Sequence, residues 1–188
     1  MERRELLKLI ALATGTAFIG GDLFLSGCKN APALGGATFS ENDIGFLDEV
    51  AETIIPKTTT PGAKDAAVGT FMTVMVNDCY DKKDQQTFHE GIKKLDDACQ
   101  KANNTSFMKA TPKQRTSLLT TLDKEAKEHA KSKGKDDPNH YFTMMKQLTL
   151  FGFFTSKPGA TQVLRHEAVP GHYDGALPYK KGDRAWAE

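Results

Sequence analysis

Apolar positions recur at helical spacing along most of the chain between residues 40 and 155. The first run follows Ser40 and acidic residues, as expected for a capped helix start, and it ends at Pro56. The second run is the most regular, with apolar positions at i, i+3, i+4 and i+7 from Val68 to Cys79. Further apolar stripes, between about residues 84 and 101 and after Thr111-Pro112, predict a third and a fourth helix.

A fifth helix is expected to start at Asp137-Pro138 and to carry the apolar residues from Tyr141 to Phe151. The charged stretch from Lys124 to Asp137 is interpreted as a solvated helix end followed by a loop. No run of useful length has strand periodicity. The pattern therefore predicts an all-α fold, a small helical bundle of about five helices.

The pattern changes after Ser156, where glycine and proline recur every few residues. Only a short helix from about Ala160 to Arg165 is expected there, and the rest of the tail is expected to be irregular. A long irregular segment in a compact domain is usually functional when it is ordered. We therefore predict that the tail, residues 156–188, binds a partner, the alternative being that it packs on the chain's own bundle. Its expected contact residues, with two phenylalanines that precede it, are Phe153, Phe154, Pro170, Tyr173, Pro178 and Trp186.

The first 28 residues predict an export signal, because a charged start leads into an apolar run and then into small residues. Arg3 and Arg4, followed by Glu5-Leu6-Leu7-Lys8, are similar to a twin-arginine motif, which routes folded proteins out of the bacterial cytoplasm. Leu25-Ser26-Gly27-Cys28 is similar to a lipobox, in which the thiol of Cys28 accepts a lipid. The mature protein would then start at Cys28 and be held on a membrane by its acyl chains.

These signals divide the chain into a signal peptide at residues 1–28, a small-residue tether at 29–38 and a helical domain at 39–188. The apolar run of the signal is interrupted and shorter than the ~20 residues that span a bilayer, so no permanent transmembrane helix is expected there. The expected location is the periplasmic side of a bacterial membrane.

Composition excludes two classes of protein. With 39% apolar and 26% charged residues among 188, the chain has the composition of a folded globular protein. Its formal charge of +1 gives no strong positive electrostatic potential that would attract nucleic acid. No nucleic-acid partner is therefore expected.

The reactive side chains form no catalytic pattern. His166-Glu167 and His172 lack the spacing of a zinc helix, and His89 and His129 are expected at the surface. Cys79 and Cys99 are interpreted as two buried free thiols, with a disulfide between them as the alternative. No nucleophile elbow, nucleotide-binding loop or haem-attachment motif is present. We therefore expect no catalytic residue, cofactor or metal in this chain.

Four ordered motifs resemble the gluconate 2-dehydrogenase subunit 3 family, and together they span about residues 40–186. Departures are few: Phe153 stands where tyrosine is frequent, and Ala176 stands where a cysteine is frequent, so a disulfide through that position cannot form. The motifs are Ile54-Ile55-Pro56-x-Thr58-x-Thr60-Pro61-Gly62-Ala63; Gly91 within Phe88 to Leu95; Leu148-Thr149-x-x-Gly152-Phe153-Phe154-Thr155-Ser156-x-x-Gly159; and Pro170-Gly171-x-Tyr173-x-Gly175-x-x-Pro178 with Arg184-Ala185-Trp186.

This resemblance implies a non-catalytic small subunit of a periplasmic flavin-dependent sugar or glycoside dehydrogenase. The FAD would belong to a large GMC-type catalytic subunit, which this chain would stabilise, export and anchor to the membrane. A cytochrome c that accepts the electrons is a further expected partner. A second hypothesis is a free-standing envelope lipoprotein that binds a ligand or assembles envelope components.

Overall fold

The computed structural model describes residues 38–135, 137–169, 171–172 and 174–187. Contacts divide the chain into residues 1–35 and residues 36–188, and every element below belongs to the second unit. The predicted signal with Arg3, Arg4 and Cys28, and nearly all of the tether, lies outside the described residues.

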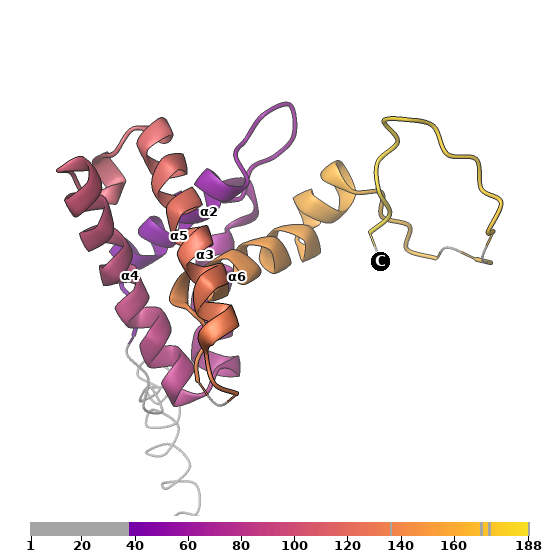
Figure 1. The fold of residues 1–188 in the computed structure, drawn as a ribbon. Helices are drawn as coiled ribbons and strands as arrows, with labels where there is room; N and C mark the ends of the chain where they lie inside the picture. The colour runs from indigo at the N-terminus through magenta and orange to yellow at the C-terminus, as the bar shows by residue number, and fades with distance from the viewer. Residues whose placement is uncertain (1–37, 136, 170, 173, 188) are drawn as a thin grey trace, which may run out of the picture. The chain divides into compact units, whose positions relative to one another are not determined.

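The described part of the chain is helical, and the only β-pairing within it is one isolated bridge between Arg165 and Trp186 (Figure 1). This confirms the predicted all-α fold. The five α-helices are α2 (Glu41–Ile54), α3 (Val68–Cys79), α4 (Lys82–Asn103), α5 (Pro112–Ser132) and α6 (Tyr141–Thr155). The short turns are η1 (Lys64–Ala66), η2 (Phe107–Lys109) and η3 (Gly159–Val163).

Two helices start where their capping residues predict. The Ser40 hydroxyl accepts from the amide of Asp43 at 3.2 Å, and the Asp43 carboxylate accepts from the amide of Ser40 at 2.8 Å. Thr111 and Gln114 form the same reciprocal box at the start of α5. These bonds satisfy amides that the first turn of a helix leaves without partners.

Other boundaries differ from the prediction. Helix α4 starts at Lys82 because Asp81 accepts from the amide of Asp84 at 2.8 Å. The predicted start of α6 at Asp137-Pro138 is wrong, because the Asp137 carboxylate instead accepts from the amide of Gly134 at 2.8 Å in the preceding turn. Helix α6 starts at Tyr141, where His140 Nδ1 accepts from the amide of Phe142 at 3.2 Å.

Helix α6 contributes more buried side chains than any other helix and packs against α2, α3, α4 and α5. Its apolar residues are distributed around most of its circumference, which is typical of a central helix. The fully buried side chains Leu47, Met72 and Leu95 surround it from α2, α3 and α4. The buried apolar side chains of the core all precede the tail, from which Val163 of η3 packs against them.

The thiols and histidines correct two predictions. Both cysteines are free and Cys99 is buried, but Cys79, at the last residue of α3, is exposed. His89 and His129 are half-buried rather than at the surface, and the His89 ring stacks on Phe39 with centroids 4.0 Å apart. In the described residues, no helix combines the length and apolar character needed to cross a membrane.

Candidate functional site

A cluster of apolar side chains lies exposed where α3 packs against α6. The rings of Phe71 and Phe151 have centroids 5.6 Å apart, and 51% of the Phe151 surface is exposed. Val74, Leu150 and Phe154 are exposed on the same two helices. Single exposed apolar residues are normal, whereas a cluster of them is typical of an interaction surface. We call these five residues the apolar helix face.

Phe153 and Phe154 have different environments although they are neighbours in sequence. Phe153 belongs to the core and is 1% exposed, so its side chain is not presented to a partner. Phe154 is exposed, and its ring meets that of Phe153 edge-on at 5.2 Å between centroids. Of the two predicted contact residues, only Phe154 is at the surface.

The tail leaves the bundle through η3, a single π-helical turn that replaces the predicted helix from Ala160 to Arg165. Beyond η3 the chain runs out and returns, as Figure 1 shows in yellow. The Arg165 amide donates to the Ala185 carbonyl at 2.7 Å, and the Ala187 amide donates to the Arg165 carbonyl at 3.0 Å. We call residues 165–187 the tail loop and this paired base its neck.

Side chains reinforce the neck. The Arg165 guanidinium lies over the Trp186 ring, 3.9 Å from its centroid. Arg184 donates to the carbonyls of Thr161 and Gln162 in η3, both at 3.0 Å. Trp186 is 39% exposed, so its ring packs on Arg165 while part of the side chain remains accessible.

The structure describes only one of the three remaining predicted contact residues of the tail. Pro178 is exposed. Pro170 and Tyr173 lie outside the described residues. Val169 and Leu177, which were not expected to contact a partner, are exposed apolar residues of the tail loop, as is Tyr179, a tyrosine expected from sequence to anchor the tail on a partner or on the bundle.

The Thr58-x-Thr60-Pro61-Gly62 loop after α2 is fixed by a carboxylate that the sequence analysis missed. The two oxygens of Glu52 accept from the amides of Lys57 at 2.8 Å and Lys64 at 2.9 Å. A Cβ at Gly62 would lie 2.5 Å from both oxygens, so a glycine is needed for this approach. The contact joins residues 5 and 12 positions apart through a loop, and helical periodicity gives no signal for it.

A second missed group is Arg115 of α5, which ties three elements together. Its Nε donates to the Phe107 carbonyl at 2.9 Å, its Nη2 donates to the Met108 carbonyl at 2.7 Å, and its Nη1 pairs with Glu49 of α2. Burial lowers the pKa of Arg115 from its ordinary value, and the group stays charged at neutral pH. The arrangement fixes η2 against α2 and α5, which is a structural role.

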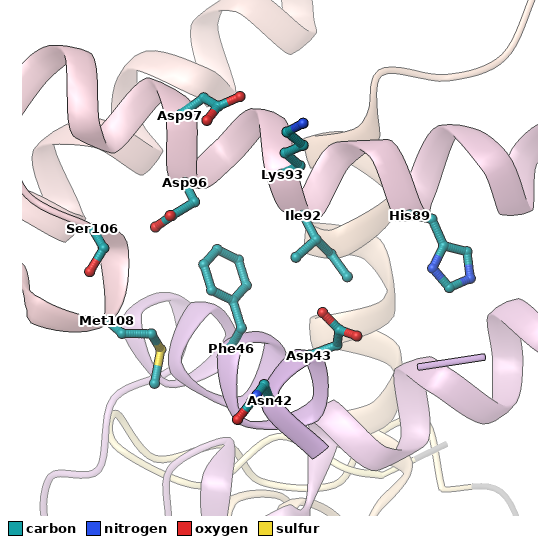
Figure 2. Close-up of a pocket in the computed structure, with 10 residues that line it drawn as sticks. All are labelled: Asn42, Asp43, Phe46, His89, Ile92, Lys93, Asp96, Asp97, Ser106 and Met108. Carbon is teal, nitrogen blue, oxygen red and sulfur yellow. The ribbon is translucent and has the colours of Figure 1, made fainter. Parts of the chain in front are cut away.

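A groove of about 380 Å³ lies between α2, α4 and η2, with Phe46 and Ile92 among its lining residues (Figure 2). Two of its three carboxylates stabilise the fold: Asp43 caps α2, and Asp96 accepts from the amide of Phe107 at 2.7 Å. In the part of the chain that the structure describes, no group of three His, Cys, Asp or Glu side chains is placed to hold a metal.

His129 and His140 lie close together at the ends of α5 and α6, with ring centroids 5.7 Å apart. Burial lowers the pKa of His140 from 6.5, and the neighbouring His129 lowers it further. His140 Nδ1 accepts the Phe142 amide bond described above, a role that only the neutral ring can fill. His140 therefore caps the start of α6.

Comparison with known families places these features in context. Residues 41–171, well over half of the chain, match the family model described as gluconate 2-dehydrogenase subunit 3. The chain belongs to the gluconate 2-dehydrogenase subunit 3 family. No curated protein and no solved structure matches it. The family is described as a subunit of a dehydrogenase, which indicates an accessory role within a dehydrogenase assembly.

Within this subunit 3 chain, three of the glycines that carry the family resemblance lie at close contacts in the helical bundle. The Tyr141 side chain packs directly on Gly91 of α4, and the Phe71 ring packs on Gly152 of α6. Gly159 abuts the carbonyl of Phe153 where the chain turns after α6. Since a Cβ at any of these three positions would overlap a neighbour, we interpret Gly91, Gly152 and Gly159 as packing residues.

Proposed function

We propose that this subunit 3 chain is a non-catalytic accessory subunit that binds and stabilises a flavin-containing catalytic subunit. The large subunit, of the GMC type, carries the FAD and oxidises a sugar or glycoside. The observation that carries the proposal is family membership combined with the apolar helix face, because a folded bundle that exposes such a face gains stability by covering it.

The distribution of side-chain roles supports a non-catalytic subunit. The carboxylates and guanidinium with well-defined partners, Glu52, Asp96 and Arg115, bind backbone amides and carbonyls of the fold. Catalytic groups instead converge on a cleft with their polar atoms available to substrate. The polar network described above therefore positions loops and helix ends.

Two faces suit the contact with the large subunit. The apolar helix face is central to the proposal because its phenylalanines Phe71, Phe151 and Phe154 are of the residue type that dominates interface energetics. The exposed side of the tail loop adds Leu177 and Tyr179. Phe153 is omitted, since it is part of the core.

Export and anchoring complete the proposal. Arg3 and Arg4 supply a twin-arginine signal for the assembled pair, and Cys28 supplies its lipid anchor on the periplasmic side of the membrane. A cytochrome c accepts the electrons from the large subunit. In this arrangement the chain needs no cofactor motif of its own, because its signal exports a folded complex whose cofactor lies in the large subunit.

The test is reconstitution. A GMC-type flavoprotein from the same organism is produced with and without this chain, and its sugar-dehydrogenase activity and melting temperature are measured. We expect the flavin to remain with the large subunit, and we expect this chain to raise its melting temperature. A purified chain that oxidises a sugar by itself, or a flavoprotein indifferent to its presence, would contradict the proposal.

A further inference from the structure

The tail loop has a built base. Its neck combines two backbone hydrogen bonds between residues 165 and 185–187 with the Arg165–Trp186 stacking contact. Arg184 adds two bonds to carbonyls of η3. All of these contacts lie within residues 161–187, so the neck closes the loop without help from the helical core. These contacts tie the two ends of the loop to each other.

Two turns stiffen the returning limb of the loop. In the first, Asp174 accepts from the amide of Ala176 at 2.9 Å and its carbonyl accepts from the amide of Leu177 at 3.3 Å. In the second, Asp183 accepts from the amide of Lys180 at 3.0 Å, and Gly182 takes a φ of +97°. Between the turns lies Leu177-Pro178-Tyr179, which we call the apolar tip.

The apolar tip is exposed although it is held in place. Leu177 is 49% exposed and Tyr179 is 77% exposed, and Pro178 between them restricts the backbone. Restricting a loop before it binds reduces the entropy lost on association. An exposed leucine and tyrosine on a stiffened loop are therefore suited to inserting into a partner.

Charge indicates the kind of surface the tip fits. From Arg165 to Trp186 the sequence has four basic residues and three acidic ones, and the tip has none. A segment of this charge balance has little attraction for an anionic lipid surface, which recognises clusters of basic residues. A protein surface with an apolar depression is the matching partner.

We propose that the apolar tip inserts into a depression on the large flavin-containing subunit, and that the Arg165–Trp186 neck positions it without touching that subunit. This inference rests on the proposed function and assigns the tail residues different roles. Trp186, expected from sequence to contact the partner, is a positioning residue. Leu177 and Tyr179 are the contact residues, and they lie beyond residues 41–171 that match the family.

The experiment measures affinity for the purified large flavin-containing subunit of the same organism, using the full chain and three variants. Leu177→Ala with Tyr179→Ala removes the tip, and we expect binding to weaken about a hundredfold or more. Trp186→Ala opens the neck, and we expect a loss of about tenfold through added flexibility. Met108→Ala in η2 is the matched control, since Met108 is 47% exposed, and its affinity should be unchanged.

A disulfide separates positioning from contact. Residues 165 and 186 are bridge partners, and paired segments lie about 4.8 Å apart, within the range that a disulfide spans. In a Cys79→Ser background, Arg165→Cys with Trp186→Cys should bind weakly when reduced and regain nearly full affinity when oxidised. Failure of the oxidised form to regain affinity would show that Trp186 itself contacts the partner and would overturn its positioning role.

The same measurements distinguish failure of this inference from failure of the proposed function. If the wild-type chain binds the large subunit and the tip variant binds equally well, the tip is not a contact. Self-association of the wild-type chain that the tip substitutions abolish, with unchanged binding to the large subunit, would assign the tip to a second copy. If the wild-type chain does not bind the large subunit at all, the proposed function itself fails.

Discussion

The ring of Phe71 on α3 packs on the backbone of Gly152 on α6, where a Cβ would lie 2.5 Å from the ring. The same ring meets Phe151 at the surface, with centroids 5.6 Å apart. One phenylalanine thus joins the close packing of two helices to the exposed apolar helix face. Residues that stabilise the fold and residues proposed to bind the partner are therefore neighbours here. Substitutions are needed to distinguish the two roles.

Phe153 and Phe151 provide that separation, because both lie on α6 but only Phe153 is buried. We expect Phe153→Ala to lower the free energy of unfolding by about 3–5 kcal/mol, as for a phenylalanine removed from a core. Phe151→Ala should change it by much less and should weaken binding to the large subunit. Urea unfolding and binding measurements on the same proteins check both; equal stability losses would contradict the assigned environments.

The glycine of α4 gives a second prediction. Gly91→Ala places a methyl group against Cβ of Tyr141, which no rotamer change can move, and we expect a net loss of roughly 1–3 kcal/mol in unfolding free energy. Gly45→Ala in α2 is the control, because a Cβ there meets nothing within 4 Å. That substitution should stabilise the chain by about 0.5–1 kcal/mol through helix propensity. Thermal unfolding distinguishes the two; stabilisation by Gly91→Ala would show that the contact is loose.

His140 predicts a pH dependence of stability. Its pKa in the folded chain lies below the ordinary value of 6.5, first because of burial and then because of His129. As the pH falls below 6.5, the unfolded chain takes up a proton that folded His140 resists, so the stabilisation present above that pH is progressively lost. Protonation also removes the acceptor for the amide of Phe142.

His140→Asn keeps a side-chain acceptor at this helix start without a titrating group. We therefore expect the wild-type chain to lose more unfolding free energy between pH 7.5 and pH 5.5 than the His140→Asn variant does. Urea unfolding at the two pH values measures this difference. Identical losses in the two proteins would exclude His140 as the source.

Helix positions were predictable from sequence because they depend on local periodicity and capping, as the match at Ser40 and Thr111 shows. The start of α6 was not, since Asp137 could cap a helix or close the preceding turn, and only the tertiary fold decides between them. Phe153 and Phe154 were grouped as contacts because sequence does not reveal which neighbour faces the core. Glu52 and Arg115 act across loops, a kind of contact that periodicity does not encode.

The predicted export signal and lipid anchor can be tested in cells. Arg3→Lys with Arg4→Lys should retain both this chain and its large partner in the cytoplasm, because only this chain is proposed to carry the signal. Fractionation followed by detection of each subunit measures this. Cys28→Ser is the companion variant and should abolish lipid labelling while export continues. Normal export of the large subunit beside the double-lysine variant would reject the shared signal.

The central claim is that this subunit 3 chain has no flavin of its own and binds a subunit that has one. Native mass spectrometry of the complex purified through a tag on this chain tests it most directly, since FAD mass can be assigned to each released subunit. The account predicts a complex with the large subunit, FAD on the released large subunit and none on this chain. FAD retained by this chain, or a tagged chain recovered alone after co-expression, would contradict it.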